Sequence, residues 1–243
     1  MVLMGKLALV TGGGHRVGRA ITLALARHGC DLMLHYFQSG EAAASTAAEA
    51  RAFGRRVAIC AADLGRMEGV RALFAEVDRT FGGLDVLVNS AAVFEPIPLL
   101  EASEDDWRRT MDLNLRGAAF CLQQAAHRMN ARGGGAIVNV SDAAGHRPFR
   151  RYPLHSISKA GIEMLTRAAA LELAPSIRVN AVVPGPILKP PGMSEESWHS
   201  IATRGPQRRP GTPEAVAEAV LFLLGNDYIT GESLRVDGGD LLG

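Results

Sequence analysis

The chain has 243 residues and a net charge of +1, with 47% hydrophobic and 21% charged residues. These values are ordinary for a globular protein and allow one α/β domain with a sizeable core. The near-neutral charge and the 5% aromatic content argue against nucleic acid or an anionic membrane as a partner.

The cysteines and the apolar stretches indicate a cellular compartment. Cys30, Cys60 and Cys121 are odd in number, show no CxxC spacing and lie in or beside apolar segments. Such cysteines are typical of small buried residues in a reducing environment. The stretch MVLMGKLALV lacks the features of a signal peptide, and AVAEAVLFLLG is too short to span a bilayer. We therefore expect a cytoplasmic protein.

Short apolar runs alternate with segments of helical periodicity along the chain. Strands are predicted at 7–10, 31–36, 56–63, 84–89, 135–141, 177–184 and 233–239. Helices are predicted after the first strand, at about 39–54, around 70–81, after Ser103, from the stretch 152–161 onward and after Thr212. Nearly all-apolar strands separated by helices indicate a parallel sheet covered on both faces. No linker divides the chain, so we expect a single domain over residues 1–243.

One long irregular stretch, residues 188–210, follows the sixth predicted strand. In an open parallel sheet, ligands bind beyond the carboxyl ends of the strands. We therefore expect this stretch to be a substrate loop that covers a small-molecule ligand.

The stretch VTGGGHRVGRA links the first strand to the first helix. Glycines let the backbone approach a phosphate, and the helix N-terminus supplies N–H donors. Gly12, Gly14 and Gly18 are spaced more widely than in GxGxxG, so a plain tight turn is an alternative.

The end of the second strand bears on the cofactor. An acidic residue there would bind the ribose hydroxyls of NAD and repel the extra phosphate of NADP. The sequence has no acid at positions 35–39, and His15 and Arg16 lie in the glycine loop. This pattern favours NADP(H).

Seven motifs then occur in order: TGGGHRVG at 11–18, AADL at 61–64, NSAA at 89–92, NL at 114–115, NVSD at 139–142, HSISK at 155–159 and VVPGPI at 182–187. Together they resemble the short-chain dehydrogenase/reductase family over essentially the whole chain. The resemblance implies a Rossmann-type, doubly wound, seven-stranded parallel sheet, a nicotinamide cofactor and a homotetramer or dimer.

The resemblance also implies which residues bind the cofactor. They are Gly12, Gly14, His15, Arg16, Val17 and Gly18, then His35, Tyr36, Phe37, Gln38 and Ser39, then Asp63, Leu64, Asn89, Ser90 and Ala91, and finally Lys159, Pro184, Gly185 and Ile187. Gln38 stands where the resemblance leads us to expect arginine, so the preference for NADP(H) is expected to be modest.

Four features are similar to the pteridine reductase branch of the family. Arg16 replaces a usual glycine, LHYFQS occupies 34–39, Phe94 falls where a pterin ring would stack, and Asp142 replaces the usual serine. Arg16 as a solvated loop charge and Phe94 as a packing residue are the alternatives. Ala92 departs from the branch, which often has serine at that position.

The largest departure from the family is His155, because the residue four before Lys159 is normally tyrosine. Lys159 matches the lysine that binds the nicotinamide ribose, and Asn114 matches the asparagine of the water relay. Histidine ionises near neutral pH, so His155 is a candidate proton donor. Three alternatives remain open: Asp142 and a water protonate the substrate, the site has lost its chemistry, or Tyr152 substitutes.

We interpret the chain as an NADPH-dependent reductase of a C=N bond in a pterin or related heterocycle. Arg16, Phe94, Asp142 and His155 would contact the substrate, and Asp142, His155, Lys159 and Asn114 would be catalytic. The alternatives are reduction of a carbonyl or C=C bond in another small molecule, and a non-catalytic NADP-binding protein.

The histidines show no metal-ligand spacing, so no metal is expected. Arg147, Arg150 and Arg151 are interpreted as a solvated or interface face, or as groups that favour an anionic substrate tail.

Overall fold

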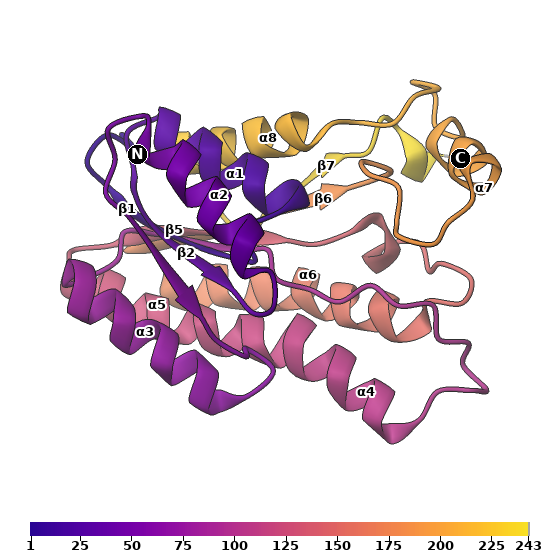
Figure 1. Cartoon of the computed structure of the whole chain (residues 1–243), viewed down its shortest axis with the longest axis horizontal. Coiled ribbons are helices and arrows are strands. Elements are labelled where there is room, and N and C mark those ends of the chain that lie inside the picture. The colour runs from indigo at the N-terminus through magenta and orange to yellow at the C-terminus, as the bar shows by residue number, and fades with distance from the viewer. Residues whose placement is uncertain (243) are drawn as a thin grey trace.

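The structure is a computed structural model, and it describes residues 1–242. Its centre is a seven-stranded sheet in the order β3-β2-β1-β4-β5-β6-β7, with every pair parallel (Figure 1). The strands are β1 (Leu7–Thr11), β2 (Asp31–Tyr36), β3 (Val57–Ala61), β4 (Val86–Asn89), β5 (Gly135–Val140), β6 (Ile177–Pro184) and β7 (Ser233–Val236). The predicted doubly wound sheet is confirmed.

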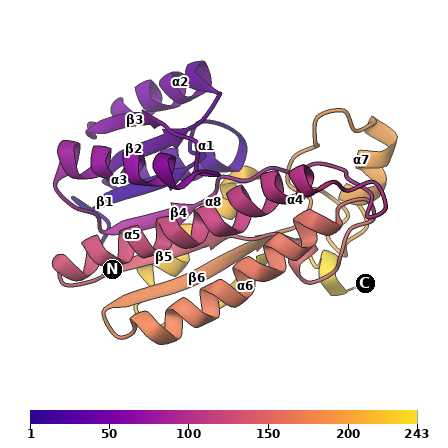
Figure 2. The ribbon, with the colours of Figure 1, turned by 90° about the horizontal axis from the view of Figure 1, so that it is seen from below.

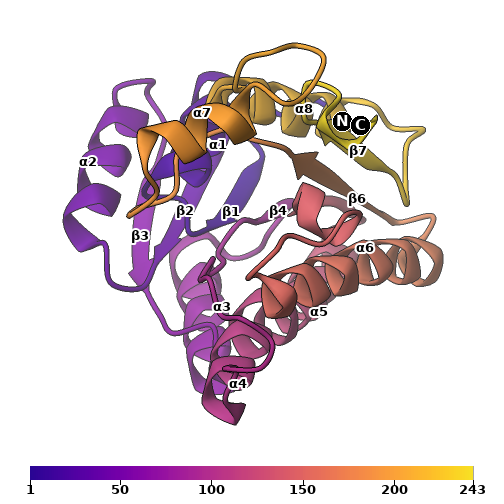
Figure 3. The ribbon, with the colours of Figure 1, turned by 90° about the vertical axis from the view of Figure 1, so that its right-hand side faces the viewer.

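Helices cover both faces of the sheet, and the end view separates the two layers (Figure 3). One layer contains α1 (Arg16–Arg27), α2 (Gly40–Arg51) and α8 (Pro213–Gly225). The other contains α3 (Met67–Phe81), α4 (Glu104–Met111), α5 (Ala118–Ala131) and α6 (Pro153–Leu173), which Figure 2 shows from below. Strand order reverses between β1 and β4, which is where such sheets bind ligands.

The strands are apolar throughout because each face packs against a helix layer. In β1, Ala8 and Val10 belong to the core under α1 and α8, whereas Leu7 and Leu9 belong to the core under α3 and α5. Successive side chains of a strand point to opposite faces, so two buried faces require an unbroken apolar run. The sheet is thus a rigid base from which the loops at its carboxyl edge project.

Helix starts agree well with the capping signals. The Ser103 hydroxyl accepts from the Asp106 N–H in a capping box, and the Thr212 hydroxyl accepts from the Ala215 N–H before Pro213. The helix that begins after Ser103 is not continuous, because residues 112–117 form a π-helical segment, η1 (Asp112–Gly117). This segment carries Asn114, and π-bulges often occur at functional sites.

The stretch 188–210 is less irregular than predicted. It contains α7 (Glu195–Ala202), whose first turn is capped by the Ser194 hydroxyl. Two short 3₁₀ turns, η2 (Ala143–Gly145) and η3 (Asp240–Leu242), lie near the same end of the sheet. No helix within residues 1–242 is long and apolar enough to cross a membrane.

Candidate active site

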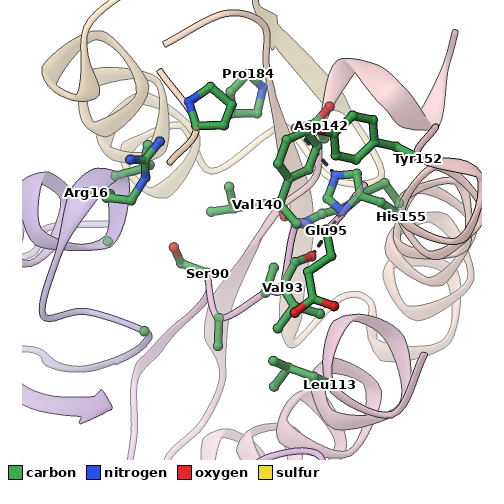
Figure 4. A pocket seen from close by; sticks show the side chains of 18 of the residues that line it. Arg16, Ser90, Val93, Glu95, Leu113, Val140, Asp142, Tyr152, His155 and Pro184 are labelled. Atoms are coloured by element: carbon green, nitrogen blue, oxygen red, sulfur yellow. Dashed lines mark hydrogen bonds and ion pairs between the residues drawn. The ribbon is translucent and has the colours of Figure 1, made fainter. Parts of the chain in front are cut away.

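A cleft of about 1560 Å³ runs along the carboxyl edge of the sheet. Its walls are the segments that follow β1 to β6, and Figure 4 shows side chains that line it. Its cover is the stretch with α7, which we call the lid (residues 188–210); Figure 3 shows where α7 lies. Most residues predicted to bind cofactor or substrate line this cleft. They are Gly12, His15, Arg16, Val17, Gly18, His35, Tyr36, Phe37, Gln38, Ser39, Asp63, Leu64, Ser90, Ala91, Phe94, Asp142, His155, Lys159, Pro184, Gly185 and Ile187.

Gly14, Asn89 and Asn114 do not line the cleft but lie behind its wall. A Cβ on Gly14 would lie 2.9 Å from the Cα of Ala43 in α2, so this glycine permits helix packing. The Asn89 amide donates to the carbonyl of Ala118 and to Asn139 inside the sheet edge. These three residues therefore support the wall of the cleft from behind.

The glycine loop fits a phosphate-binding role. A Cβ on Gly18 would lie 2.1 Å from the carbonyl oxygen of Gly12, so only glycine allows the loop to close onto α1. The Thr22 hydroxyl donates to the carbonyls of Gly13 and Gly18 and fixes the same turn. The helix N-terminus therefore faces the cleft with the loop held tightly against it.

His35 has a structural role at the end of β2. Its Nδ1 accepts from the Gly12 N–H at 3.2 Å, and its Nε2 lies 2.9 Å from the carbonyl of Ala62, which can only accept. The ring is therefore the neutral tautomer with the proton on Nε2. Burial lowers the pKa of His35, in agreement with a neutral ring. His35 thus joins the glycine loop to the end of β3.

Arg16 connects the glycine loop to the lid. Its backbone has a φ of 51°, in the left-handed region that favours glycine. Its guanidinium donates to the carbonyls of Leu188 and Lys189 at 3.1–3.4 Å. The alternative of Arg16 as a plain solvated loop charge therefore fits poorly, because the guanidinium has defined partners.

The far end of the lid is held by Asp240, which is only 2% exposed. Arg204 donates to both oxygens of this carboxylate at 2.7 and 2.8 Å, and Arg147 donates to one at 2.8 Å. Between these two attachments, the lid presents Met193, Trp198 and Ile201 to the cleft. This arrangement could not be predicted from the sequence, because Arg147 and Asp240 are 93 residues apart.

An aromatic cluster forms the wall of the cleft beside the start of α6. Phe94 stacks on Tyr152, with ring centroids 4.2 Å apart and planes inclined by 12°. The Phe94 ring also meets the His155 ring edge-on, with centroids 4.7 Å apart. Phe94 remains 37% exposed, so it is both a packing residue and part of the cleft surface.

His155 lies between Val93 and Asp142 (Figure 4). Its Nδ1 is 3.2 Å from the carbonyl of Val93, and because a carbonyl only accepts, Nδ1 carries a proton. Its Nε2 is buried, has no hydrogen-bond partner within residues 1–242 and lies 3.7 Å from Oδ2 of Asp142. The site therefore presents one imidazole nitrogen, Nε2, next to a carboxylate.

Asn114 and Lys159 support this pair. The Asn114 amide accepts from the Val93 N–H and donates to the Val93 carbonyl and the Ser158 hydroxyl. The Lys159 ammonium donates to the carbonyl of Val140 at 2.8 Å. Burial lowers the pKa of Lys159, and the charges of Asp142 and Glu163 partly oppose this effect. Asn114 therefore orients the backbone that holds His155, while Lys159 is a buried cation beside the cleft.

Comparisons with known proteins agree with this geometry. A family model described as enoyl-(acyl carrier protein) reductase matches residues 14–240. A short-chain type dehydrogenase/reductase of Picea abies is 33% identical over 98% of this chain and 93% of the relative. The chain belongs to the short-chain dehydrogenase/reductase family. It is thus an oxidoreductase of a family that uses NAD(H) or NADP(H).

Two further relatives have named reactions. The 3-oxoacyl-[acyl-carrier-protein] reductase FabG of Staphylococcus aureus is 36% identical over 97% of this chain and 98% of the relative. The crystal structure of acetoin dehydrogenase from Enterobacter cloacae superposes with a TM-score of 0.90 and 36% identity, covering 98% of this chain and 97% of that chain. Both names refer to carbonyl chemistry, and the narrower resemblance to pteridine reductases has no support among these relatives.

Proposed function

We propose that this short-chain dehydrogenase/reductase is an NADP(H)-dependent reductase of a carbonyl group in a small molecule. The observation that carries the proposal is the hydrogen bond from His155 Nδ1 to Val93, which leaves Nε2 as the group next to the cleft. An imidazole in this position replaces the phenol expected from the family and would act as the general acid.

The cofactor preference follows from charge at the adenosine end of the cleft. The last residue of β2, Tyr36, and the three that follow it, Phe37, Gln38 and Ser39, line this end, and none of them is acidic. A carboxylate is therefore absent from the place where it would repel a ribose phosphate. Asp63 follows β3, where it accepts from the Gly65 N–H and pairs with Arg66. Arg16 adds positive charge, so NADP(H) is favoured over NAD(H).

The residues of the chain divide the chemistry between them. A bound NADPH would supply the hydride. His155 Nε2 would give the proton to the carbonyl oxygen, and the Asp142 carboxylate 3.7 Å away would stabilise the protonated ring by charge. Lys159 would hold the nicotinamide ribose, and the lid residues Trp198 and Ile201 would exclude water from the reacting atoms.

A second candidate, reduction of a C=N bond in a pterin or related heterocycle, is favoured by Asp142 and Phe94. A carboxylate can accept hydrogen bonds from the N–H groups of such a ring, and the partly exposed face of Phe94 can stack on it. Reduction of a C=C bond would use the same hydride and proton positions. We also expect a homotetramer or dimer, which the exposed apolar side chains Met164 and Leu171 on α6 support.

Steady-state assays with NADPH and NADH test the proposal. The panel contains diacetyl, acetoin, an aromatic diketone and a dihydropterin. We expect reduction of at least one carbonyl compound with NADPH, and dihydropterin reduction alone would favour the second candidate. A protein that binds NADPH but reduces nothing on the panel would be a binding protein, and the proposal would be wrong.

A further inference from the structure

The cleft has room for more than a dinucleotide and a very small ketone. Its volume is about 1560 Å³, whereas a pocket for one small ligand measures about 300–1000 Å³. Arg16, at the glycine loop, and Tyr152, before α6, lie on opposite sides of it (Figure 4). Aromatic side chains from three segments line the end at Tyr152, and they are Phe94, Phe149, Tyr152 and Trp198. This end therefore suits a substrate with a planar apolar body.

The charged side chains that line the cleft are mostly paired with one another. Every acid among them lies within 3.7 Å of a basic side chain, and the acids are Asp63, Glu95, Asp112, Asp142 and Asp240. Of the arginines and lysines, only Arg16, Arg150 and Lys159 have no carboxylate partner within residues 1–242. Arg16 lies where a cofactor phosphate would bind, and Lys159 would hold the nicotinamide ribose. Arg150 is the cation that the cofactor does not explain.

Arg150 lies in a tight turn just before α6. The Tyr152 N–H donates to the Phe149 carbonyl at 3.1 Å, and the Phe149 N–H donates to the Ser156 hydroxyl at 3.3 Å, so the turn is bonded to the first turn of α6. Arg150 and Arg151 occupy the two central positions of this turn, and only Arg150 lines the cleft. The Arg150 side chain is exposed and has no hydrogen-bond partner within residues 1–242. Its guanidinium is therefore available to a ligand.

Arg204 borders the same end of the cleft from the lid. Its Nε and Nη2 donate to the two oxygens of Asp240, while its Nη1 has no partner among the described residues. The Asp240 side chain is 1% exposed and that of Arg204 is 46% exposed, so the carboxylate lies behind the guanidinium. The buried acid fixes the orientation of Arg204 and leaves its outer edge for another acceptor. An arginine held in this way loses little freedom when it binds a second anion.

Asp240 brings the turn and the lid together. Arg147 donates to the same carboxylate at 2.8 Å, and it precedes Arg150 by three residues. Three residues of chain span at most about 11 Å. Arg150 and Arg204 therefore lie on facing sides of one end of the cleft.

We propose that the substrate carries a carboxylate on a planar apolar body and that Arg150 and Arg204 select it; this rests on the proposed carbonyl reduction. The carboxylate would accept hydrogen bonds from Arg150 and from Nη1 of Arg204, and such charge-assisted bonds are stronger than neutral ones. The ring would lie against Phe94 and Trp198, with its carbonyl next to His155. The substrate class is therefore aromatic oxo acids rather than neutral ketones.

Two ketones that differ by one charge test the proposal, 4-acetylbenzoate and its methyl ester. The acid is ionised at neutral pH, because model carboxyls titrate near about pH 4. With NADPH, kcat/KM should be about tenfold higher for the acid, mainly through KM. Arg150→Gln should remove most of this preference, and Arg150→Glu should invert it. Arg151→Gln is the matched control, because it removes the same charge one residue away and outside the cleft, so the preference should remain.

The same two ketones allow a measurement without turnover. In the presence of NADP neither can be reduced, so isothermal titration measures their dead-end binding. The native protein should bind the acid about tenfold more tightly than the ester, and Arg150→Gln should lose this difference. Added salt should reduce the difference, because the guanidinium of Arg150 is exposed. Arg204→Ala should weaken the binding of both ketones through the lid, and that of the acid by a further several-fold.

The outcomes separate this proposal from the proposed function. A protein that reduces neither these ketones nor any compound of the panel overturns the proposed function, and the dead-end affinities then decide the selection alone. Equal affinities for the acid and the ester overturn the selection, whether or not the protein is active. A preference for the acid that survives in Arg150→Glu, or that Arg151→Gln loses as fully as Arg150→Gln, also overturns it. Equal weakening of both ketones in Arg204→Ala overturns the part assigned to Arg204.

Discussion

Phe94 and Tyr152 stack face to face with centroids 4.2 Å apart, and the same Phe94 ring meets His155 edge-on at 4.7 Å. One aromatic side chain therefore fixes the position of the imidazole and also forms part of the cleft surface. The stacking on Tyr152 occupies one face of Phe94. The ring is still 37% exposed, so part of it remains available to a planar ligand.

The Phe94→Ala variant should lose both the ring that positions the His155 imidazole and the cleft surface that a planar ligand would contact. We expect a loss of about 1–3 kcal/mol in the binding of aromatic substrates or inhibitors, the range found for stacking on a side chain. NADPH affinity, measured by fluorescence titration, should change much less. Native affinity for planar ligands in a well-folded Phe94→Ala protein would make Phe94 a packing residue only.

His155→Ala tests the proton donor. A positioned acid contributes about 10²–10⁴ in rate, so turnover should fall on that scale while NADPH still binds. If Asp142 and a water protonate the substrate instead, His155→Ala will be nearly silent and Asp142→Asn severe.

His155→Tyr restores the residue that the family carries before Lys159. Because Lys159 is buried beside this position, it can stabilise a phenolate. We expect a gain of ketone reduction and little gain on pterins, measured side by side with both substrate classes. A His155→Tyr protein that binds NADPH and reduces neither class would show that more than this residue has departed from the family.

Gln38→Arg tests the cofactor site. In the native protein we expect NADPH to bind about tenfold more tightly than NADH, or about 1.4 kcal/mol. The arginine would add a bidentate partner for the ribose phosphate, so the ratio should increase through tighter NADPH binding. Isothermal titration with both cofactors measures this, and equal native affinities would refute the charge argument.

Arg204→Ala tests the attachment of the lid to Asp240. Arg147 would still pair with Asp240, so the protein should fold, but the lid should open more readily. We expect KM to rise by several-fold with a smaller change in kcat, together with faster proteolysis within residues 188–210. The control is Arg209→Ala in the same lid, because Arg209 has no charged partner among the described residues. Equal KM values for the two variants would contradict the role of Asp240.

Some elements were predictable to the residue. The strands at 31–36 and 177–184 coincide with β2 and β6, because an apolar run bounded by polar residues or proline defines a buried strand well. The strands at 56–63 and 233–239 were predicted too long, because the apolar or extended pattern continues into the loops that line the cleft. The π-helical turn at Asn114 occupies only residues 112–117 between two α-helices, and it is too short to show in the apolar pattern of the sequence.

The site was predictable where a short motif carries its own geometry. Asp142, His155 and Lys159 come together because a strand end and one helix face position them. The attachment of the lid could not be predicted, since Arg204 and Asp240 meet only through the fold. The tautomer of His35 and the pairing of His146 with Glu163 could not be predicted either, because each depends on atoms from separate segments of the chain.

The bond between Arg16 and the lid has a kinetic consequence. A phosphate bound at the glycine loop would compete with the carbonyls of Leu188 and Lys189 for the same guanidinium. The binding of the first ligand would thereby change how strongly the lid is attached over the rest of the cleft. We expect a compulsory order in which the dinucleotide enters first and leaves last. Product-inhibition patterns would then be competitive between NADP and NADPH and mixed for every other pair.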